Sequence, residues 1–554
     1  MSLKSQPIQP VPAQTAQVAH AAFVDGNPYL TLRDQLGSIF QDEDFTALFP
    51  RCGQPGWPPW RLALVTLMQF RENLSDRQAA EAVRARIDWK YLLGLELTDE
   101  GFDFSVLSEF RQRLLAGSAE ELLLDQLLQQ CGAVGLLKGR GHQRTDATHV
   151  LASVRVLNRL ELVAETLRAV LNGLATVAPD WVQAVVPPEW YERYGKRIED
   201  TRLPRDDDAR LAYAQQVGED GFALLAALTT PEAGVLGKLP LVETLRQVWH
   251  RHYEPRPATN TDPFAPVIWF RPKPLPQAEC PESPYDPEAR FRTKRDTQWT
   301  GYMVHLTETC DPSHPYLITQ VHTTRATVHE ARCTAPIQQA LVDKGRSPHT
   351  HLVDAGYVDA ELLVHSQEVH GIQLRGPTRP DSSWQTKAGG AFSVDQFEID
   401  WEQQQVRCPR GKRSVSWSPR PRPAGGSPYI QVRFNLKDCR ACKVREYCTR
   451  SVNQARILKL HPQPQGRALS EARQWYESEE GRNEYHRRAG IEGTISQGVR
   501  AFGLRKARYR GLAKTHLQQV ATAAAMNIDR LFAWFEGYPR ATTRTSRFAA
   551  LAPV

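Results

Sequence analysis

Residues 142–156 read HQRTDATHVLASVRV, and this stretch sets the fold class. β-Branched residues alternate with polar ones around Asp146, which is the pattern of a half-buried β-strand. The strand carries a carboxylate near its centre, so it is a candidate both for the core of a sheet and for part of a functional site.

Downstream of this strand, strand-like and helix-like segments alternate. GYMVHLTET at 301–309 and PYLITQVH at 315–322 are strand-like and are joined by a proline-containing turn, which predicts a hairpin. The series continues with a helix over 328–344, a short apolar strand ending at Asp354, a helix over 359–368 and a strand over 371–376. Such alternation predicts an α/β domain over 141–535.

Two segments interrupt this domain, and a helical region precedes it. Residues 157–290 are helical by pattern and predict a helical insertion, whereas residues 377–480 form a basic, cysteine-containing insertion. Residues 29–140 predict an all-helical domain suited to DNA binding or to dimerisation and packing. The two ends, 1–28 and 536–554, are expected to be tails, the first of them poorly ordered.

Acidic residues that converge from separate elements are the ligands Mg²⁺ prefers at phosphoryl-transfer sites. Asp146 lies within the first strand, and Asp354 closes a later one. Tyr485, Arg488 and Glu492 are spaced three and four residues apart, which places them on one face of a predicted helix. The plainer alternatives are turn-forming aspartates and a surface ion pair.

Three segments, in this order, resemble those of bacterial insertion-sequence transposases of the DDE class, in particular the group with the signature Y-x-x-R-x-x-x-E. The matching segments are TDATHV around Asp146, LVDAGYVD around Asp354 and YHRRAGIEGTISQG around Glu492. The segment GWPPWRLALVTLMQFRENLSDRQAAEAVRARIDWKYLLGL, residues 56–95, is similar to the helical N-terminal domain of many of these transposases. The resemblance spans residues 50–530.

The resemblance implies an RNase H-like mixed sheet in which Asp146, Asp354 and Glu492 hold two Mg²⁺ or Mn²⁺ ions. It implies cleavage by water at the ends of an insertion sequence, then attack of the freed 3′-hydroxyl on target DNA. Arg488 is expected to bind a phosphate, and Tyr485 to contact the DNA backbone or to orient Glu492. The implied partners are double-stranded DNA, as terminal inverted repeats and as target, and a second copy of the chain.

One position departs from the family pattern. A lysine often follows the glutamate by seven residues, and here that position is Val499. Arg500 is the next residue, about 100° away around an unbroken helix, so whether it replaces the lysine is open. Arg500, Arg505 and Lys506 are expected to bind DNA.

Four of the nine cysteines cluster within 41 residues, at Cys408, Cys439, Cys442 and Cys448. A C-x-x-C pair presents two thiolates to one ion, and tetrahedral zinc takes four. The cluster therefore predicts a structural zinc site, with packed or simply reduced cysteines as the alternative. No basic start followed by an apolar segment indicates secretion, so we expect reduced thiols, a cytoplasmic location and association with the nucleoid when DNA is bound.

The net charge of +7 is small for 554 residues but is unevenly distributed. Residues 407–450 carry 12 basic and two acidic side chains, and residues 481–514 carry nine and two, which gives net charges of +10 and +7. Charge concentrated in this way favours a nucleic-acid partner. A membrane span is excluded, since no run of 18 apolar residues exists.

We therefore expect a DNA transposase that cleaves at insertion-sequence ends and transfers the 3′-hydroxyl strand into target DNA. Two alternatives are open: a structure-specific DNA nuclease on the same core, and a domesticated, inactive DNA-binding protein. The presence of Asp146, Asp354 and Glu492 together counts against the second.

Overall fold

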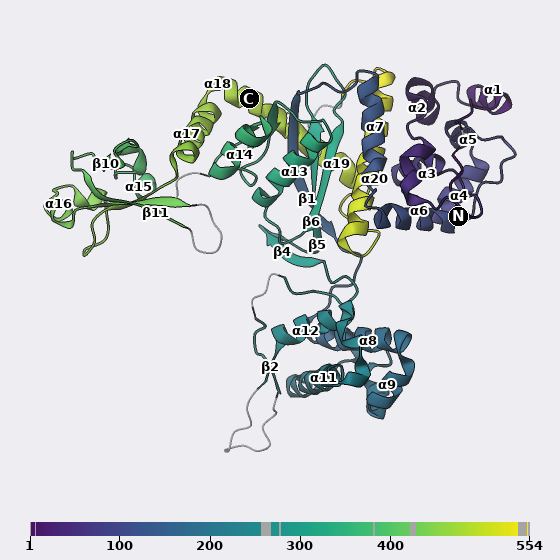
Figure 1. Ribbon diagram of the computed structural model, residues 1–554, viewed down its shortest axis with the longest axis horizontal. Coiled ribbons are helices and arrows are strands. Elements are labelled where there is room, and N and C mark those ends of the chain that lie inside the picture. Colours follow the sequence, from purple (N-terminus) through teal and green to yellow (C-terminus); the bar gives the residue numbers. More distant parts are fainter. Residues whose placement is uncertain are drawn as a thin grey trace.

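The computed structural model describes residues 2–5, 7–255, 268–275, 279–379, 383–421, 428–540 and 551. Figure 1 shows a central β-sheet with helices packed against it, a helical N-terminal region beside it, and two further units that extend away from it. The architecture is α/β, as the alternating patterns predicted, and the sheet is mixed, as the resemblance implied.

The central sheet is built from strands of both directions. Its strands are β1 (His142–Leu151), β4 (Arg290–Lys294), β5 (Thr297–Thr309), β6 (Ile318–Arg325), β7 (Thr350–Leu352) and β8 (Gln373–Arg375). The order is β4-β5-β1-β7-β8, and β6 also pairs with β5 as the predicted hairpin. β1 runs antiparallel to β5 and parallel to β7, so the strand that carries Asp146 is central.

Each of the last two strands of the parallel half is preceded by a helix. α13 (Ala331–Asp343) precedes β7, and α14 (Ala360–His370) precedes β8. Cys333, Ile337 and Leu341 on α13 are buried together with Leu363 on α14 and form a core against this half of the sheet. These elements match the helices predicted from the apolar periodicity.

The N-terminal region is helical, and it begins earlier than expected. Its helices are α1 (Ala13–Ala22), α2 (Pro28–Leu36), α3 (Pro59–Arg71), α4 (Asp76–Ala85), α5 (Ile87–Leu93), α6 (Ser105–Ala116) and α7 (Leu122–Ala133). The prediction of a poorly ordered tail over 1–28 is wrong for α1, because the alanine-rich segment favours helix and its small side chains pack against α5. Thr15 on α1 is buried and donates to the carbonyl of Leu95 at 2.8 Å. Most of the expected tail over 536–554 lies outside the described residues.

The last long helix, α20 (Leu512–Phe535), lies between the N-terminal helices and the sheet, where it contacts α3, α7 and β6 (Figure 1). Two of the polar residues in its apolar sequence tie it to its neighbours. The Asn527 amide pairs with both backbone groups of Ile318, at 2.8 and 2.9 Å, and Asp529 accepts from Arg71 at 2.6 Å. No helix in the described part of the chain is long and apolar enough to cross a membrane.

A helical unit lies between β1 and β4 in the sequence and has a separate apolar core. It comprises α8 (Arg159–Val177), α9 (Pro179–Val185), α10 (Pro188–Tyr194), α11 (Asp207–Ala227), α12 (Pro240–His252), β2 (Tyr253–Pro255) and β3 (Ile268–Phe270). Trp249 is buried against α11 at Gly221, where a Cβ atom would overlap the indole ring. This unit falls within the segment predicted to be a helical insertion.

A second unit contains the four clustered cysteines. It is formed by α15 (Trp384–Lys387), β9 (Glu398–Asp400), β10 (Gln405–Arg407), β11 (Ser414–Arg420), β12 (Tyr429–Phe434), α16 (Leu436–Arg440) and β13 (Ile457–Leu460). Its core surrounds Val432 and Phe434. α17 (Gln463–Glu477) leads from this unit back to the sheet, where it packs against α14 (Figure 1).

A buried ion network attaches the C-terminal helices to the sheet. Glu308 on β5 is fully buried and accepts from Arg144 on β1 at 2.7 Å and from Arg530 on α20 at 2.7 Å. Its second oxygen also accepts from Thr494 on α19 (Gly490–Ala501) at 2.6 Å. A Cβ atom at Gly490 would overlap the Arg144 guanidinium, so the glycine permits this close approach.

Replacing Glu308 by glutamine is expected to destabilise the protein by about 3–5 kcal/mol, because two buried guanidinium groups lose their counter-charge. Urea denaturation followed by tryptophan fluorescence measures the change. Glu81→Gln is the control, since its exposed pair with Arg84 is worth under about 1 kcal/mol. Equal stability of the two variants would contradict the prediction.

Candidate active site

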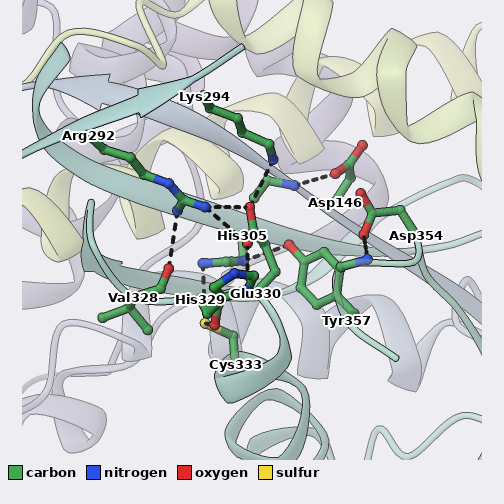
Figure 2. A network of polar contacts seen from close by, with 12 residues as sticks. Asp146, Arg292, Lys294, His305, Val328, His329, Glu330, Cys333, Asp354 and Tyr357 are labelled. Atoms are coloured by element: carbon green, nitrogen blue, oxygen red, sulfur yellow. Dashed lines mark hydrogen bonds and ion pairs between the residues drawn. The ribbon is translucent and has the colours of Figure 1, made fainter. Parts of the chain in front are cut away.

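The register of the sheet brings Asp146 and Asp354 together. Arg144 on β1 pairs with Leu352 on β7 in the parallel ladder. Two residues further along each chain, Asp146 and Asp354 reach the same level on neighbouring segments, which lie about 4.8 Å apart in a sheet. Figure 2 shows the two carboxylates side by side. The expected convergence of these two residues is therefore seen in the fold.

Each aspartate is oriented by a backbone hydrogen bond. One oxygen of Asp354 accepts from the amide of Gly356 at 2.8 Å, and one oxygen of Asp146 accepts from the amide of Ala147 at 2.7 Å. Burial raises the pKa of Asp146 above its usual value, and the charge of Asp354 adds to the rise, while Arg488 opposes it. The site thus concentrates negative charge that favours a cation.

Arg488 supplies that positive charge. Its guanidinium donates to the second oxygen of Asp146 at 2.6 Å and to Glu492 at 3.3 Å. Burial lowers the pKa of Arg488, but the neighbouring charges, led by Asp146, more than offset this and raise it overall. Glu492 itself is 68% exposed. Arg488 therefore links the first and third candidate carboxylates.

The expected single helical face is interrupted. Tyr485 ends α18 (Glu479–Tyr485), Arg488 lies in the 3-10 turn η8 (His486–Ala489), and Glu492 lies on α19. The turn forms where the Arg144 guanidinium donates to the carbonyl of Arg487, because an inserted side chain disturbs the regular helical ladder. The contact between Arg488 and Glu492 forms across this turn.

Tyr485 lies half-buried beside the aspartates. Its ring packs edge-on against Tyr476 with centroids 5.3 Å apart, and burial raises its pKa to about 12. The phenol is therefore protonated at neutral pH and is able to donate a hydrogen bond.

The other predicted DNA-binding residues lie at different places. Arg505 donates to Thr148 on β1 at 2.8 Å, two residues from Asp146. Lys506 is exposed, and its backbone forms an isolated β-bridge with Leu151 at the end of β1. Arg500 is exposed near the end of α19, whereas Val499 packs against the main apolar core.

A second ionic cluster beside the aspartates was not recognised in the sequence. Glu330 is buried and accepts from Lys294 at 2.8 Å and from Arg292 at 3.1 Å (Figure 2). Burial raises the pKa of Glu330, but its bonds to Lys294 and the nearby charges overcome this and lower it to about 2. The only available signal was the alternation of Arg292 and Lys294 on one strand, which also suits a solvated face.

Glu330→Gln is expected to lower stability near neutral pH, because Arg292 and Lys294 lose an ionised partner. The pKa of Glu330 is depressed from 4.5 to about 2, so its stabilising contribution is complete above pH 4.5. That contribution is lost as pH falls toward 2. Melting temperatures of wild type and variant, measured between pH 2 and pH 7, should therefore converge on acidification, and a constant difference would contradict this.

The four clustered cysteines share one cavity of about 330 Å³ in the second unit. Cys408 accepts from the amide of Lys412 at 3.4 Å, as in a tight turn around a sulfur. Burial raises the pKa of Cys448 to about 11. Within the residues that the structure describes, no three His, Cys, Asp or Glu side chains are grouped closely enough to hold a metal ion, either here or at the aspartates.

Comparison with known families identifies two segments of the chain. Residues 407–532 match the model of a transposase DDE domain, and residues 19–113 match the model of a transposase domain (DUF772). The first match contains Tyr485, Arg488, Glu492 and the clustered cysteines. No curated protein and no solved structure matches the chain.

The two matches support an insertion-sequence transposase of the DDE class. Transposases of the DDE class are nuclease and transposition enzymes, and the substrate of that class is DNA. The N-terminal match covers the helical region, and the C-terminal match covers the helices that meet the sheet at Glu308.

Proposed function

We propose that this protein is a DNA transposase that cleaves at insertion-sequence ends and joins the freed 3′-hydroxyl to target DNA. The observation that carries the proposal is the pairing of Asp146 with Asp354 at the sheet, linked through Arg488 to Glu492. The strand order β6-β5-β1-β7-β8, antiparallel in its first three strands and parallel in the last three, supports an RNase H-like core.

Asp146, Asp354 and Glu492 are the residues that would hold two Mg²⁺ or Mn²⁺ ions, since all three offer hard carboxylate oxygens. Because these carboxylates are not grouped closely enough for this in the described structure, binding would require Arg488 to release them and Glu492 to approach the aspartates. Such ions supply activation of the attacking oxygen and stabilisation of the leaving one. Arg488 occupies one oxygen of Asp146 in this structure. We infer that a DNA phosphate competes for this guanidinium, because phosphate accepts two parallel hydrogen bonds from arginine.

The protein side chains around the aspartates position the DNA. Lys294 is held near Asp146 by Glu330, and Arg505 is held beside it by Thr148. Tyr485, whose phenol is protonated, would donate a hydrogen bond to the DNA backbone or to Glu492. Cations fixed by packing in this way bind a phosphate with little further loss of side-chain freedom.

Asp146→Asn and Asp354→Asn are each expected to lower cleavage and strand transfer by at least about 100-fold, the loss that disturbing even an outer-shell metal partner can cause. The assay uses Mg²⁺, duplexes that carry the inverted repeats flanking the gene, and a supercoiled target plasmid. Asp343→Asn is the matched control, because this carboxylate is exposed and binds only Gln339 among the described side chains.

The products separate the candidate functions. Joined products that disappear in Asp146→Asn support a transposase. Cleavage without joining by the wild type would identify a nuclease, and DNA binding without either reaction would identify a domesticated binding protein. We also propose that the protein acts as a homodimer, because an element presents two ends. Light scattering of the complex with paired ends tests this.

We also propose that Cys408, Cys439, Cys442 and Cys448 hold a structural zinc ion. Their common cavity and the tight turn at Cys408 support this. Zinc binding would require loss of the thiol protons and closer approach of the four sulfurs than the described structure has. About one zinc per chain is expected by elemental analysis, and Cys442→Ser should lose it whereas Cys52→Ser, at an exposed cysteine, should not. Less than half an equivalent in the wild type would contradict the proposal.

A further inference from the structure

A basic cavity lies where the end of β1 meets the helical unit. It has a volume of about 300 Å³, in the range of ligand-binding pockets. The charged and phenolic side chains that line it are Arg155, Arg168, Arg197, Arg510, Glu165 and Tyr285. Four positive charges thus face one negative charge, and none of these residues belongs to the candidate active site.

Two of the arginines are fixed by carboxylates of α8. Arg168 binds both oxygens of Glu165, at 3.0 and 2.8 Å, and Tyr285 donates to the same carboxylate at 2.6 Å. Arg155 is paired with Glu161 and donates to the carbonyl of Ile198 at 2.7 Å. These contacts build a rigid wall for the cavity.

The other two arginines bring charge that is not neutralised locally. The Arg510 guanidinium lies 5.4 Å from the centre of the Tyr285 ring, and Arg197 is exposed at the cavity. Over the part of the chain that the structure describes, neither forms an ion pair within 4.0 Å. The cavity therefore combines fixed donors with excess positive charge, which suits an oxyanion such as phosphate.

The cavity lies further along the chain segment that carries the cations Arg505 and Lys506. Beside the end of β1, Leu151 exchanges backbone hydrogen bonds with Arg505 and Ala507, at 2.8 and 2.9 Å. The segment that carries Arg505 and Lys506 then continues to Arg510 at the cavity. Asp146 and Leu151 are five residues apart on β1, or about 17 Å at 3.4 Å per residue. That length corresponds to about five base pairs of duplex.

We propose that this cavity binds a backbone phosphate of duplex DNA, about five or more base pairs from the scissile bond. The helical unit is then a clamp that holds the DNA leading to the active site. This inference rests on the proposed function in one respect, namely that DNA is the partner. A free inorganic phosphate shares the same chemistry, and the experiment separates the two sources.

The test compares the full-length wild type with the double variant Arg197→Gln/Arg510→Gln. Binding to a fluorescent 40-base-pair duplex is measured by anisotropy over a series of salt concentrations. Each phosphate contact contributes about 0.9 to the slope of log K against log salt, so the slope should fall by about 1 to 2. Arg202→Gln/Arg246→Gln is the control, because it removes the same amount of charge from positions of the helical unit that lie outside the cavity.

The outcomes are distinct. A slope reduced in the cavity variant but not in the control supports the clamp. If the cavity variant and the control variant have equal slopes, the clamp is overturned. If, in addition, inorganic phosphate raises the melting temperature of the wild type but not of the cavity variant, the cavity is identified as a small-anion site and the clamp is again overturned. If the wild type binds no DNA, the proposed function itself fails. If it binds and joins DNA while the cavity variant keeps the wild-type slope, only the clamp fails.

Discussion

The buried carboxylate of Glu308 determines where the C-terminal helices lie relative to the first strand. It binds Arg144 from β1, Arg530 from α20 and Thr494 from α19 at the same time. A buried charge with two guanidinium partners is costly to desolvate, so its main contribution is to specify one arrangement over others. Arg144 is two residues from Asp146, and Thr494 is two residues from Glu492. The network therefore positions both ends of the candidate site.

Charge balance is the second organising feature of the site. Asp146 and Asp354 are like charges side by side, and Arg488 neutralises part of that charge. Lys294 and Arg505 lie close by, each held by another residue of the sheet or its neighbouring segment. If DNA phosphates bind these cations, as proposed, the same side chains that stabilise the folded site would couple substrate binding to release of the carboxylates.

The elements and their order were readable from the sequence because they depend on local periodicity. Alternation predicted β1 and the β5–β6 hairpin, and apolar spacing predicted α13 and α14. The composition of residues 1–28 led to the wrong prediction of a poorly ordered tail. Burial of Thr15 and Ala19 of α1 against a distant part of the chain outweighs the polar composition. The parallel register that aligns Asp354 with Asp146 was not predicted, because it pairs β1 with a strand that lies far away in the sequence. The Y-x-x-R-x-x-x-E spacing identified Arg488 and Glu492 as a pair.

By itself, then, the sequence determined the class of fold, the paired aspartates and the uneven charge behind a net of +7. Only the tertiary structure decided that Arg488 bridges two carboxylates, that Glu330 gathers Lys294 and Arg292, and that four arginines from separate segments line one cavity. The physical reason is the range of the interactions. Periodicity reports contacts within a strand or helix, whereas ion pairs and cavities depend on segments brought together by packing.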